Sequence, residues 1–261
     1  MSNRRVADYD RIADRYDRRY GLHAYAGVRD ALFNSLDSGT VTAAIEVGCG
    51  TGHWLAEIRR RYPSAERLLL AGVEPAAGML SRAQAANPDA RLVRARAEAL
   101  PWRDATFDRV FCVNALHHFA DRARFFHEAR RILKPGGALM SIGKDPHADR
   151  DSWWVYDYFP ETLTIDRDRF ARVRMLRGEL AQAGFAWAES SEVDRIEAVM
   201  PASEAFAGGV VDAAYTSQLT VLSDDEFRAG AARIREANVA AAGQLNLTTD
   251  FRLYATVGWV G

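Results

Sequence analysis

The segment AAIEVGCGTGHW, residues 43–54, constrains the fold more than any other part of the sequence. Small or β-branched apolar residues surround Glu46, and three glycines follow within five positions. This pattern predicts a buried strand that ends at Val47 and turns directly into a helix. Because glycines have no Cβ, a ligand can approach the backbone amides of such a turn closely. The segment therefore predicts a ligand site at the end of a strand.

Short apolar runs alternate with helix-like runs through the middle of the chain. The predicted strands cover 43–47, 67–73, 91–93, 107–113 and 137–143, and the predicted helices cover 53–62, 76–86 and 121–133. Two later strands are expected near 192–199 and 250–259. The alternation predicts an α/β, Rossmann-like, doubly wound fold, with a mostly parallel seven-stranded sheet and helices on both faces.

Three segments do not follow this alternation. Amphipathic helices are predicted in 1–40, an aromatic loop in 144–172 and a helical pair in 200–248. We expect one domain over 1–261, in which these three segments form a helical and aromatic cap. Its core would consist of 41–143, 173–199 and 249–261. Because ligands of open α/β sheets bind beyond the carboxyl ends of the strands, the cap is expected to cover the ligand.

Charge and cysteine content limit the partners of the chain. With 34 basic and 35 acidic residues, the formal charge is −1, which does not favour binding to nucleic acid or to an anionic membrane. Cys49 and Cys112 cannot form a disulfide framework or a four-ligand zinc site, so a cytoplasmic location is expected. No apolar stretch is long enough for a signal peptide or a membrane span. A homodimer through a long N-terminal helix remains open.

The spacing of the glycines and two acidic residues indicate the kind of ligand. The loop has the spacing G-x-G-x-G, and His53 stands where the dinucleotide fingerprint needs its third glycine. A carboxylate at Glu46 disfavours a pyrophosphate and favours a ligand with a positive charge. Glu74, at the end of the second strand, can accept from both hydroxyls of a ribose. Together these features predict a cationic nucleoside instead of NAD.

Five motifs between residues 8 and 143 occur in the order of a known family. They are YDRIADRYD, IEVGCGTG, VEPAAGML, RAEALPWRDATFDRVFCVNALHHF and RRILKPGGAL. The chain resembles class I S-adenosylmethionine-dependent methyltransferases, in the small-molecule branch that includes quinone-type C-methylases. The resemblance implies transfer of a methyl group from S-adenosylmethionine to a small-molecule acceptor such as an aromatic metabolite. Two alternatives remain, an enzyme that diverts the cofactor by cyclisation or other non-methyl chemistry, and a non-catalytic cofactor-binding subunit.

The resemblance also implies which residues bind the cofactor. Glu46 and the glycine loop would hold its methionine end, Glu74 its ribose, and Pro75 and Met79 its adenine. Arg96 stands where many members have an aspartate, which moves the adenine contact to Glu98 or to the backbone. The implied cofactor residues are Tyr16, Glu46, Gly48, Cys49, Gly50, Thr51, Gly52, Glu74, Pro75, Met79, Ala97, Glu98, Asn114 and Ala115. Tyr16 and its neighbouring tyrosines either close over the cofactor or pack on the body of the protein.

Two adjacent histidines are the candidates for catalysis. Methyl transfer from a sulfonium is an in-line displacement, so it depends mainly on positioning and on exclusion of water. A base is needed only when the acceptor is a hydroxyl or a protonated amine. His117 and His118 follow the fourth strand, and histidine titrates near neutral pH. We expect one to face the ligand, with His117 toward the acceptor, and the other to pack into the body; a structural role for both remains open.

The aromatic segment SWWVYDYF, residues 152–159, is predicted to form the acceptor site. Trp153, Trp154 and Tyr158 would supply apolar walls and Asp157 a polar anchor. The alternative is a lid that only packs over the edge of the sheet. The nearby polar residues 147–151 are typical of a solvated surface, so no metal site is predicted.

Overall fold

The computed structural model describes residues 9–13, 15–37, 40–63 and 67–261. Eight strands form one sheet, in the order β3-β2-β1-β4-β5-β8-β6, and β7 pairs with β8 outside this path. The strands are β1 (Ala43–Val47), β2 (Leu69–Val73), β3 (Arg91–Val93), β4 (Phe107–Val113), β5 (Leu133–Gly143), β6 (Ser152–Trp153), β7 (Trp187–Pro201) and β8 (Asn246–Trp259). The seven expected strands are present, and the two-residue β6 is the eighth.

The first five strands are parallel, and β8 is antiparallel to β5, β6 and β7. The expected mostly parallel Rossmann-like sheet is therefore confirmed. Every residue of β1 is buried, as in a central strand covered on both faces. The strand order reverses direction between β1 and β4, and ligands of such sheets bind outside the carboxyl ends of the strands at this point.

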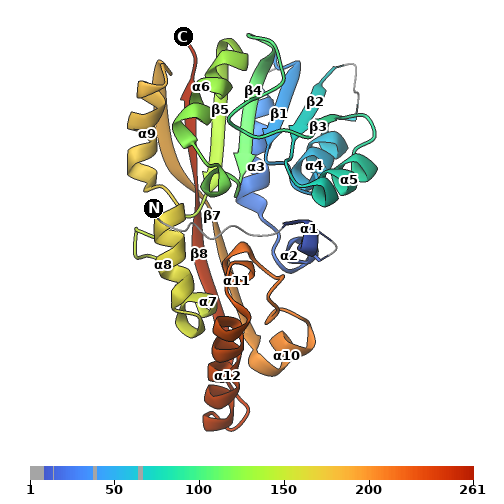
Figure 1. The fold of residues 1–261 in the computed structure, drawn as a ribbon. Coiled ribbons are helices and arrows are strands. Elements are labelled where there is room, and N and C mark those ends of the chain that lie inside the picture. The colour runs from blue at the N-terminus through green and yellow to red at the C-terminus, as the bar shows by residue number, and fades with distance from the viewer. Residues whose placement is uncertain (1–8, 14, 38–39, 64–66) are drawn as a thin grey trace.

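Helices cover both faces of the sheet (Figure 1). Ala44 of β1 packs in the cluster that includes α3 and α4, whereas Ile45 and Val47 pack in the cluster that includes α6 and α9. The helices are α1 (Tyr9–Ile12), α2 (Arg18–Leu22), α3 (Ala26–Leu36), α4 (His53–Arg61), α5 (Ala77–Ala86), the 3-10 helix η1 (Leu116–His118), α6 (Arg122–Ile132), α7 (Trp154–Tyr158), α8 (Glu161–Arg169), α9 (Val173–Gln182), α10 (Ala202–Ala207), α11 (Ser217–Thr220) and α12 (Asp224–Ala240).

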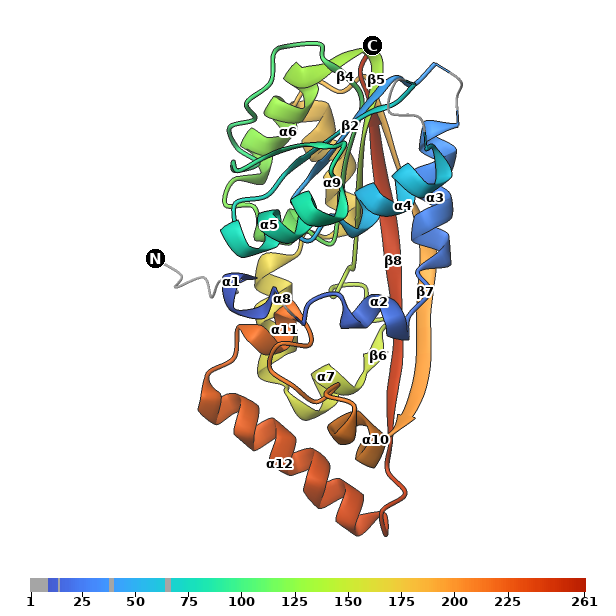
Figure 2. The ribbon, with the colours of Figure 1, turned by 90° about the vertical axis from the view of Figure 1, so that its right-hand side faces the viewer.

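Strands β7 and β8 are longer than the sequence predicted. They pair with each other from Trp187 and Trp259 at one end to Pro201 and Asn246 at the other. The first part of β7, WAESSEVD, carries mostly polar and small residues, because this strand has β8 on one edge only and is largely exposed. It therefore lacks the apolar alternation by which a half-buried strand is recognised. In Figures 1 and 2 the two strands extend from the core far into the lower part of the molecule.

The lower part of the molecule consists of the cap segments and the far ends of β7 and β8 (Figure 2). The predicted aromatic loop 144–172 is wrong as a loop, because it contains β6, α7 and α8. The predicted helical pair 200–248 contains α10, α11 and α12, and α12 forms the outermost layer. Both long strands cross the expected boundaries between core and cap, and the division into these two parts remains a prediction.

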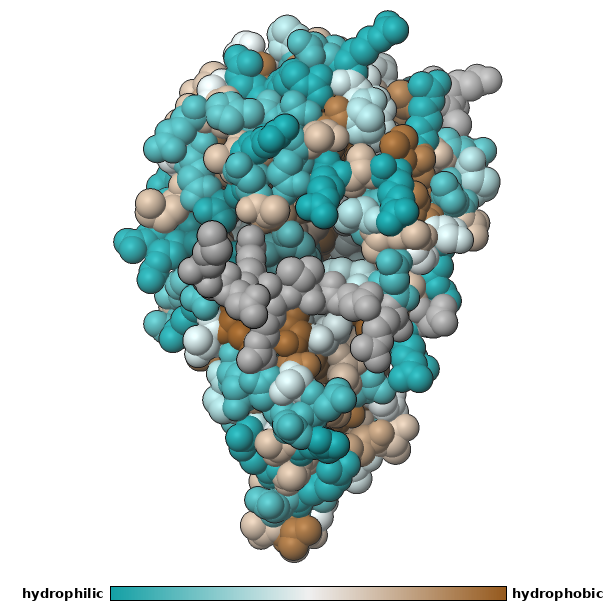
Figure 3. Space-filling model, in the orientation of Figure 1, coloured by the Kyte–Doolittle hydropathy of each residue, from teal (hydrophilic) through white to brown (hydrophobic). Residues whose placement is uncertain are grey.

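The N-terminal segment forms short helices. α1 has 4 residues, α2 has 5 and α3 has 11, so the expected long N-terminal helix is not present among the described residues. In Figure 2, α1 and α2 lie between the core and the cap. Hydrophilic residues cover most of the face shown in Figure 3. Within the described ranges, none of the helices combines the length and apolar character that crossing a membrane requires.

Candidate active site

The glycine loop between β1 and α4 has a backbone that other residues rarely adopt. Gly48, Gly50 and Gly52 all have left-handed φ angles, of 76°, 53° and 79°. A Cβ at Gly48 would lie 2.7 Å from the Cβ of Ala115, so the loop also needs the space that glycine leaves. The N–H of Gly48 donates to the carbonyl oxygen of Val73 at 2.8 Å, which joins the loop to the end of β2.

A cavity of about 430 Å³ lies beside this loop, where Gly48 follows β1, Glu74 follows β2 and Asn114 follows β4. The predicted cofactor residues that line it are Tyr16, Gly48, Gly50, Glu74, Pro75, Met79, Ala97, Glu98, Asn114 and Ala115. The other four are buried and, within the described chain, do not line this cavity: Glu46, Cys49, Thr51 and Gly52. The sequence prediction therefore identified both the lining of this cavity and part of its support.

The two predicted carboxylates differ in their contacts. Glu74 accepts hydrogen bonds from the N–H groups of Gly50 (3.0 Å) and Ala76 (2.9 Å), and burial raises its pKa while these two bonds lower it. Glu46 is only 1% exposed, and its Oε2 has no hydrogen-bond partner among the described residues. Burial and then the charge of Glu74 raise the pKa of Glu46 well above its ordinary value. A positive charge near this pair would stabilise both carboxylates.

The carboxylate of Glu98 already has partners within the protein. Its Oε1 accepts from the N–H groups of Ala120 (2.6 Å) and Asp121 (3.2 Å), at the start of α6. These two N–H groups lie directly before the first helical residue, and a carboxylate at this end of a helix is favourable. The side chain is therefore less suited to read an adenine than the sequence suggested, although Ala97 and Glu98 both line the cavity.

The described residues 9–13 and 15–22 of the N-terminal segment lie across the cavity and are attached to it by side chains. Tyr9 and Tyr16 line the cavity, and Asp10 accepts from the N–H of Gly78 at 2.7 Å in the first turn of α5. Thr51, which was predicted to contact the cofactor, instead donates to Asp17 at 2.5 Å. These contacts favour a closing role for the tyrosines over simple packing on the body.

The two histidines of η1 line different cavities. His118 lines the large cavity, and its Nε2 lies 2.5 Å from the hydroxyl of Tyr9. His117 lines two smaller cavities and stacks on Phe170, with 3.8 Å between ring centroids. The expectation that one histidine packs away from the ligand crevice is wrong, because η1 is short and both side chains face a cavity.

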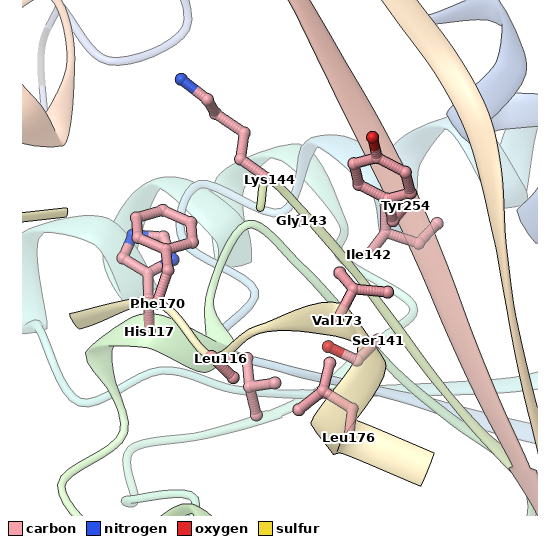
Figure 4. Close-up of a pocket in the computed structure, with 11 residues that line it drawn as sticks. Leu116, His117, Ser141, Ile142, Gly143, Lys144, Phe170, Val173, Leu176 and Tyr254 are labelled. Atoms are coloured by element: carbon pink, nitrogen blue, oxygen red, sulfur yellow. The ribbon is translucent and has the colours of Figure 1, made fainter. Parts of the chain in front are cut away.

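A smaller cavity of about 60 Å³ adjoins the large one and shares Tyr9, Tyr16 and Asn114 with it. His117, Lys144 and Phe170 line both this cavity and a third of about 30 Å³, which Figure 4 shows. The remaining residues that line the cavity of about 60 Å³ come from distant parts of the chain: His23, Tyr25, Trp153, Tyr215, Thr216, Ser217, Gln218 and Phe251. This space lies directly next to the glycine-loop cavity.

Of the predicted acceptor residues, the structure brings only Trp153 to a cavity described above. Trp153 lines the small cavity, but Trp154 is buried within the cap, where its ring lies near those of Phe159 and Tyr215. Among the described residues, Trp154, Asp157 and Tyr158 line none of the three cavities, and Asp157 is exposed. The reason is that residues 154–158 form the helix α7, which turns successive side chains in different directions.

Sequence reasoning missed Lys144, which follows the last residue of β5. Its Nζ donates to the hydroxyl of Tyr156 at 3.0 Å, and that hydroxyl donates to Asp166 at 2.7 Å. Asp166 is fully buried and is paired with Arg169 at 2.6 Å. The available signal was the position, since a polar residue directly after a central strand stands at the ligand end of the sheet.

The polar residues 147–151 form contacts of their own. The Nε2 of His147 lies 3.1 Å from the carbonyl oxygen of Phe170, Asp149 is paired with Arg167, and Asp151 accepts from a backbone N–H. In the described part of the chain, no cluster of three or more potential ligands for a metal is present.

Comparison with known proteins identifies relatives of this site. Residues 45–141 match a family model described as a methyltransferase domain. The chain is 30% identical, over 152 residues, to a 27-O-demethylrifamycin SV methyltransferase of Amycolatopsis mediterranei, with 50% of this chain and 54% of that protein covered. It is 33% identical, over 198 residues, to a malonyl-[acyl-carrier protein] O-methyltransferase of a Methylovorus species, with 69% of this chain and 64% of that protein covered. The chain thus spans less than two thirds of the length of either protein.

A solved structure has the same fold. Phosphoethanolamine N-methyltransferase 2 of Haemonchus contortus, in complex with S-adenosyl-L-methionine, superposes with a TM-score of 0.57 at 14% sequence identity. The match covers 90% of this chain and 52% of that one. At this identity the likeness establishes the fold alone.

Proposed function

We propose that this chain transfers a methyl group from S-adenosylmethionine to a small-molecule acceptor, because residues 45–141 match the methyltransferase domain family. The match of residues 45–141 to this family agrees with the resemblance that the motifs indicated, and it supports S-adenosylmethionine as the cofactor. The main support for the proposal is that the glycine-loop cavity and the small cavity beside His117 share the wall formed by Tyr9, Tyr16 and Asn114. A cofactor and an acceptor bound in these two cavities would therefore lie side by side.

The residues of the large cavity fit S-adenosylmethionine. Gly50 lines this cavity, and a Cβ at this position would meet a ring carbon of Tyr16 at 3.7 Å, so the backbone there is open to a ligand. The buried Oε2 of Glu46 lacks a partner among the described residues. A ligand with a positive charge near this loop would relieve the repulsion between Glu46 and Glu74. When bound, the cofactor supplies a methyl group on a positively charged sulfur.

We assign the residues to parts of the cofactor as follows. Glu46 and the glycine loop hold the methionine end, and Glu74 accepts from the ribose hydroxyls. Pro75 and Met79 flank the adenine. Since the carboxylate of Glu98 is engaged with α6, the adenine edge meets backbone groups near this residue.

The chain positions the acceptor and excludes water from the two cavities. The N-terminal segment contributes Tyr9 and Tyr16 to the wall of both, so its attachment closes the cofactor and acceptor spaces together. His117 lines only the acceptor side, where its ring can accept a proton from a hydroxyl or an amine. His118, which contacts Tyr9, helps to hold the N-terminal segment in place.

Titration calorimetry with S-adenosylhomocysteine and with NAD tests the cofactor. We expect heat of binding with S-adenosylhomocysteine and none with NAD, because the loop lacks the dinucleotide spacing. Incubation with isotopically methyl-labelled S-adenosylmethionine and a panel of small acceptors tests the reaction. Release of S-adenosylhomocysteine together with a labelled acceptor is expected. Methylthioadenosine as the product, or the absence of any turnover with a panel that binds, would instead support one of the two alternatives.

Substitution of each histidine tests its role. If His117 is the base, the rate in His117→Ala falls about 10²–10⁴-fold with little change in acceptor affinity, and alkaline pH partly restores it. In His118→Ala, weaker cofactor binding is the expected main effect, because the contact with Tyr9 is lost. A full rate in His117→Ala would mean that positioning alone accounts for transfer.

Three further expectations remain proposals. The free, buried thiols of Cys49 and Cys112 support a cytoplasmic location. A homodimer was expected through a long N-terminal helix, but the described N-terminal residues form short helices that line the chain's own cavity. Light scattering coupled to size-exclusion chromatography measures the assembly state. The single domain over 1–261, with its core and cap, is tested by whether thermal unfolding followed by calorimetry shows one transition.

A further inference from the structure

Lys144 is a buried cation beside the acceptor cavity. It is 7% exposed, follows the last residue of β5 and lines both small cavities together with His117 and Phe170. In Figure 4 its side chain extends from the end of β5 above the stacked rings of these two residues. The chain has 34 basic residues, but only two of them are lysines. The other, Lys134, is near the opposite end of β5.

Aromatic rings surround the ammonium group of Lys144. Its Nζ lies 3.9 Å from the ring centroid of Trp153 and 4.5 Å from those of Tyr156 and Phe251. These contacts stabilise a cation without neutralising its charge. A lysine suits this position better than an arginine, because an ammonium is compact and has three rotatable donors. One donor is directed to the Tyr156 hydroxyl.

The carboxylates near Lys144 are bound to other groups. Asp166 is paired with Arg169 and also accepts from Tyr156 and from the Nε2 of Gln218 at 2.9 Å. Asp151 accepts from the N–H of Arg252 through Oδ1, and its buried Oδ2 has no hydrogen-bond partner among the described residues. Within the described ranges, no carboxylate oxygen lies within 4.0 Å of the Nζ of Lys144. The ammonium therefore lacks a direct counter-ion in this part of the chain.

A second buried cation, Arg169, is paired with Asp166 near Lys144. Arg169 is 3% exposed and binds Asp166 through Nη2, while its Nε and Nη1 have no hydrogen-bond partner among the described residues. Burial lowers the pKa of Lys144 to about 8, while the charges of Asp166 and Asp151 act in the opposite direction. At neutral pH the ammonium is therefore still mainly protonated. An anion in the adjoining cavity would stabilise it.

We propose that Lys144 selects the acceptor, and that the acceptor carries an anionic oxygen which binds in the small cavity against the Nζ of this residue. This inference rests on the methyltransferase function proposed above and names its substrate class. A carboxylate and an ionised phenol or enol share the required chemistry. An ammonium at hydrogen-bond distance also favours the ionised form of a hydroxyl, so Lys144 keeps such an acceptor deprotonated. The aromatic rings around it hold the apolar part of the acceptor.

The test uses the full chain saturated with S-adenosylhomocysteine, whose binding is measured first on the same sample. Acetate and acetamide, which fit a cavity of about 60 Å³, form the first pair of probes. Ionised 4-nitrophenol and its methyl ether form the second pair and distinguish a phenolate from a carboxylate. We expect the preferred anion to bind about tenfold to a hundredfold more tightly than its neutral partner.

Lysine labelling identifies the responsible group without any substitution. Because the sequence has only two lysines, ¹³C labelling at the ε position gives two resonances. The resonance of Lys144 should move on addition of the anion, and that of Lys134, which is paired with Asp108 at 2.9 Å, should not. In Lys144→Met the preference for the anion should disappear, whereas Lys134→Met, the matched control, should keep it.

Several results would overturn the proposal. They are the absence of any preference for an anion in the unchanged protein, a preference that persists in Lys144→Met, or movement of the Lys134 resonance alone. Each of these can occur while S-adenosylhomocysteine binds normally, and would then refute only the acceptor class. Failure of S-adenosylhomocysteine to bind would refute the proposed function itself.

Discussion

Glu74 offers a sharp test of the cofactor site, because its carboxylate has two roles. In the free protein it accepts from the N–H groups of Gly50 and Ala76, and in the complex it would also accept from the ribose hydroxyls. Replacement by glutamine keeps the shape and one acceptor oxygen. It removes the charge and places an NH₂ group where an oxygen was.

The two roles lead to different magnitudes. A hydrogen bond to a charged group contributes about 1.5–3 kcal/mol, so Glu74→Gln should weaken binding of S-adenosylhomocysteine about 10- to 150-fold. Stability should change less, by under about 2 kcal/mol, because two effects oppose each other. The variant loses bonds to backbone N–H groups, but it also removes a buried charge whose pKa is raised by burial and which lies near Glu46.

Two measurements and one control separate these effects. Titration calorimetry gives the dissociation constant, and denaturant unfolding gives the free energy of unfolding. Glu98→Gln is the matched control, since its carboxylate stands at the same cavity but accepts from Ala120 and Asp121. It should change stability and leave the affinity within about threefold, which is below 1 kcal/mol.

An unchanged dissociation constant in Glu74→Gln would refute the assignment of the ribose to this residue. Equal losses of affinity in Glu74→Gln and Glu98→Gln would also contradict the reasoning, because the Glu98 carboxylate would then read the cofactor as the sequence first suggested.

Three more predictions concern other parts of the site. Gly136→Ala should lower the free energy of unfolding by about 1–2 kcal/mol, because Gly136 has a positive φ and open space around it. Gly48→Ala should cost about 1–3 kcal/mol more, because a Cβ there also meets the side chain of Ala115. Equal losses would show that the glycine loop can adapt to a Cβ at Gly48. Trp153→Ala and Trp154→Ala should both destabilise by about 3–5 kcal/mol, but only the first should alter acceptor KM in steady-state assays. The affinity for acetate should fall about tenfold between about pH 7 and 9 as Lys144, whose pKa is lowered to about 8, loses its proton; a flat profile would exclude this residue as the anion partner.

The parts of the site that could be predicted from the sequence are those that depend on the pattern of neighbouring residues along the chain. The glycine loop and Glu74 lie directly at strand ends, where a run of apolar residues meets turn residues, so their place in the cavity follows from the strand assignment. The parallel sheet followed from the same alternation. These features need no knowledge of which distant segments meet.

The parts that sequence missed depend on tertiary contacts. Glu98 was expected at the adenine, but its partners lie at the start of α6, more than twenty residues away. The aromatic surroundings of the Lys144 ammonium come from Trp153, Tyr156 and Phe251, which belong to three different elements. Asp157 faces solvent because one turn of helix replaced the expected loop. A single sequence contains no direct signal for such pairings.

The continuity of β7 and β8 has a kinetic consequence for turnover. The two strands stay paired from the core to the far end of the cap, so moving the cap away from the core requires this pair of strands to bend together. The N-terminal segment, by contrast, is attached across the cavity through side-chain contacts such as those of Asp10 and Asp17. We therefore expect ligands to enter and leave as the side-chain contacts of this segment break, so that these two aspartates affect how long S-adenosylhomocysteine stays bound.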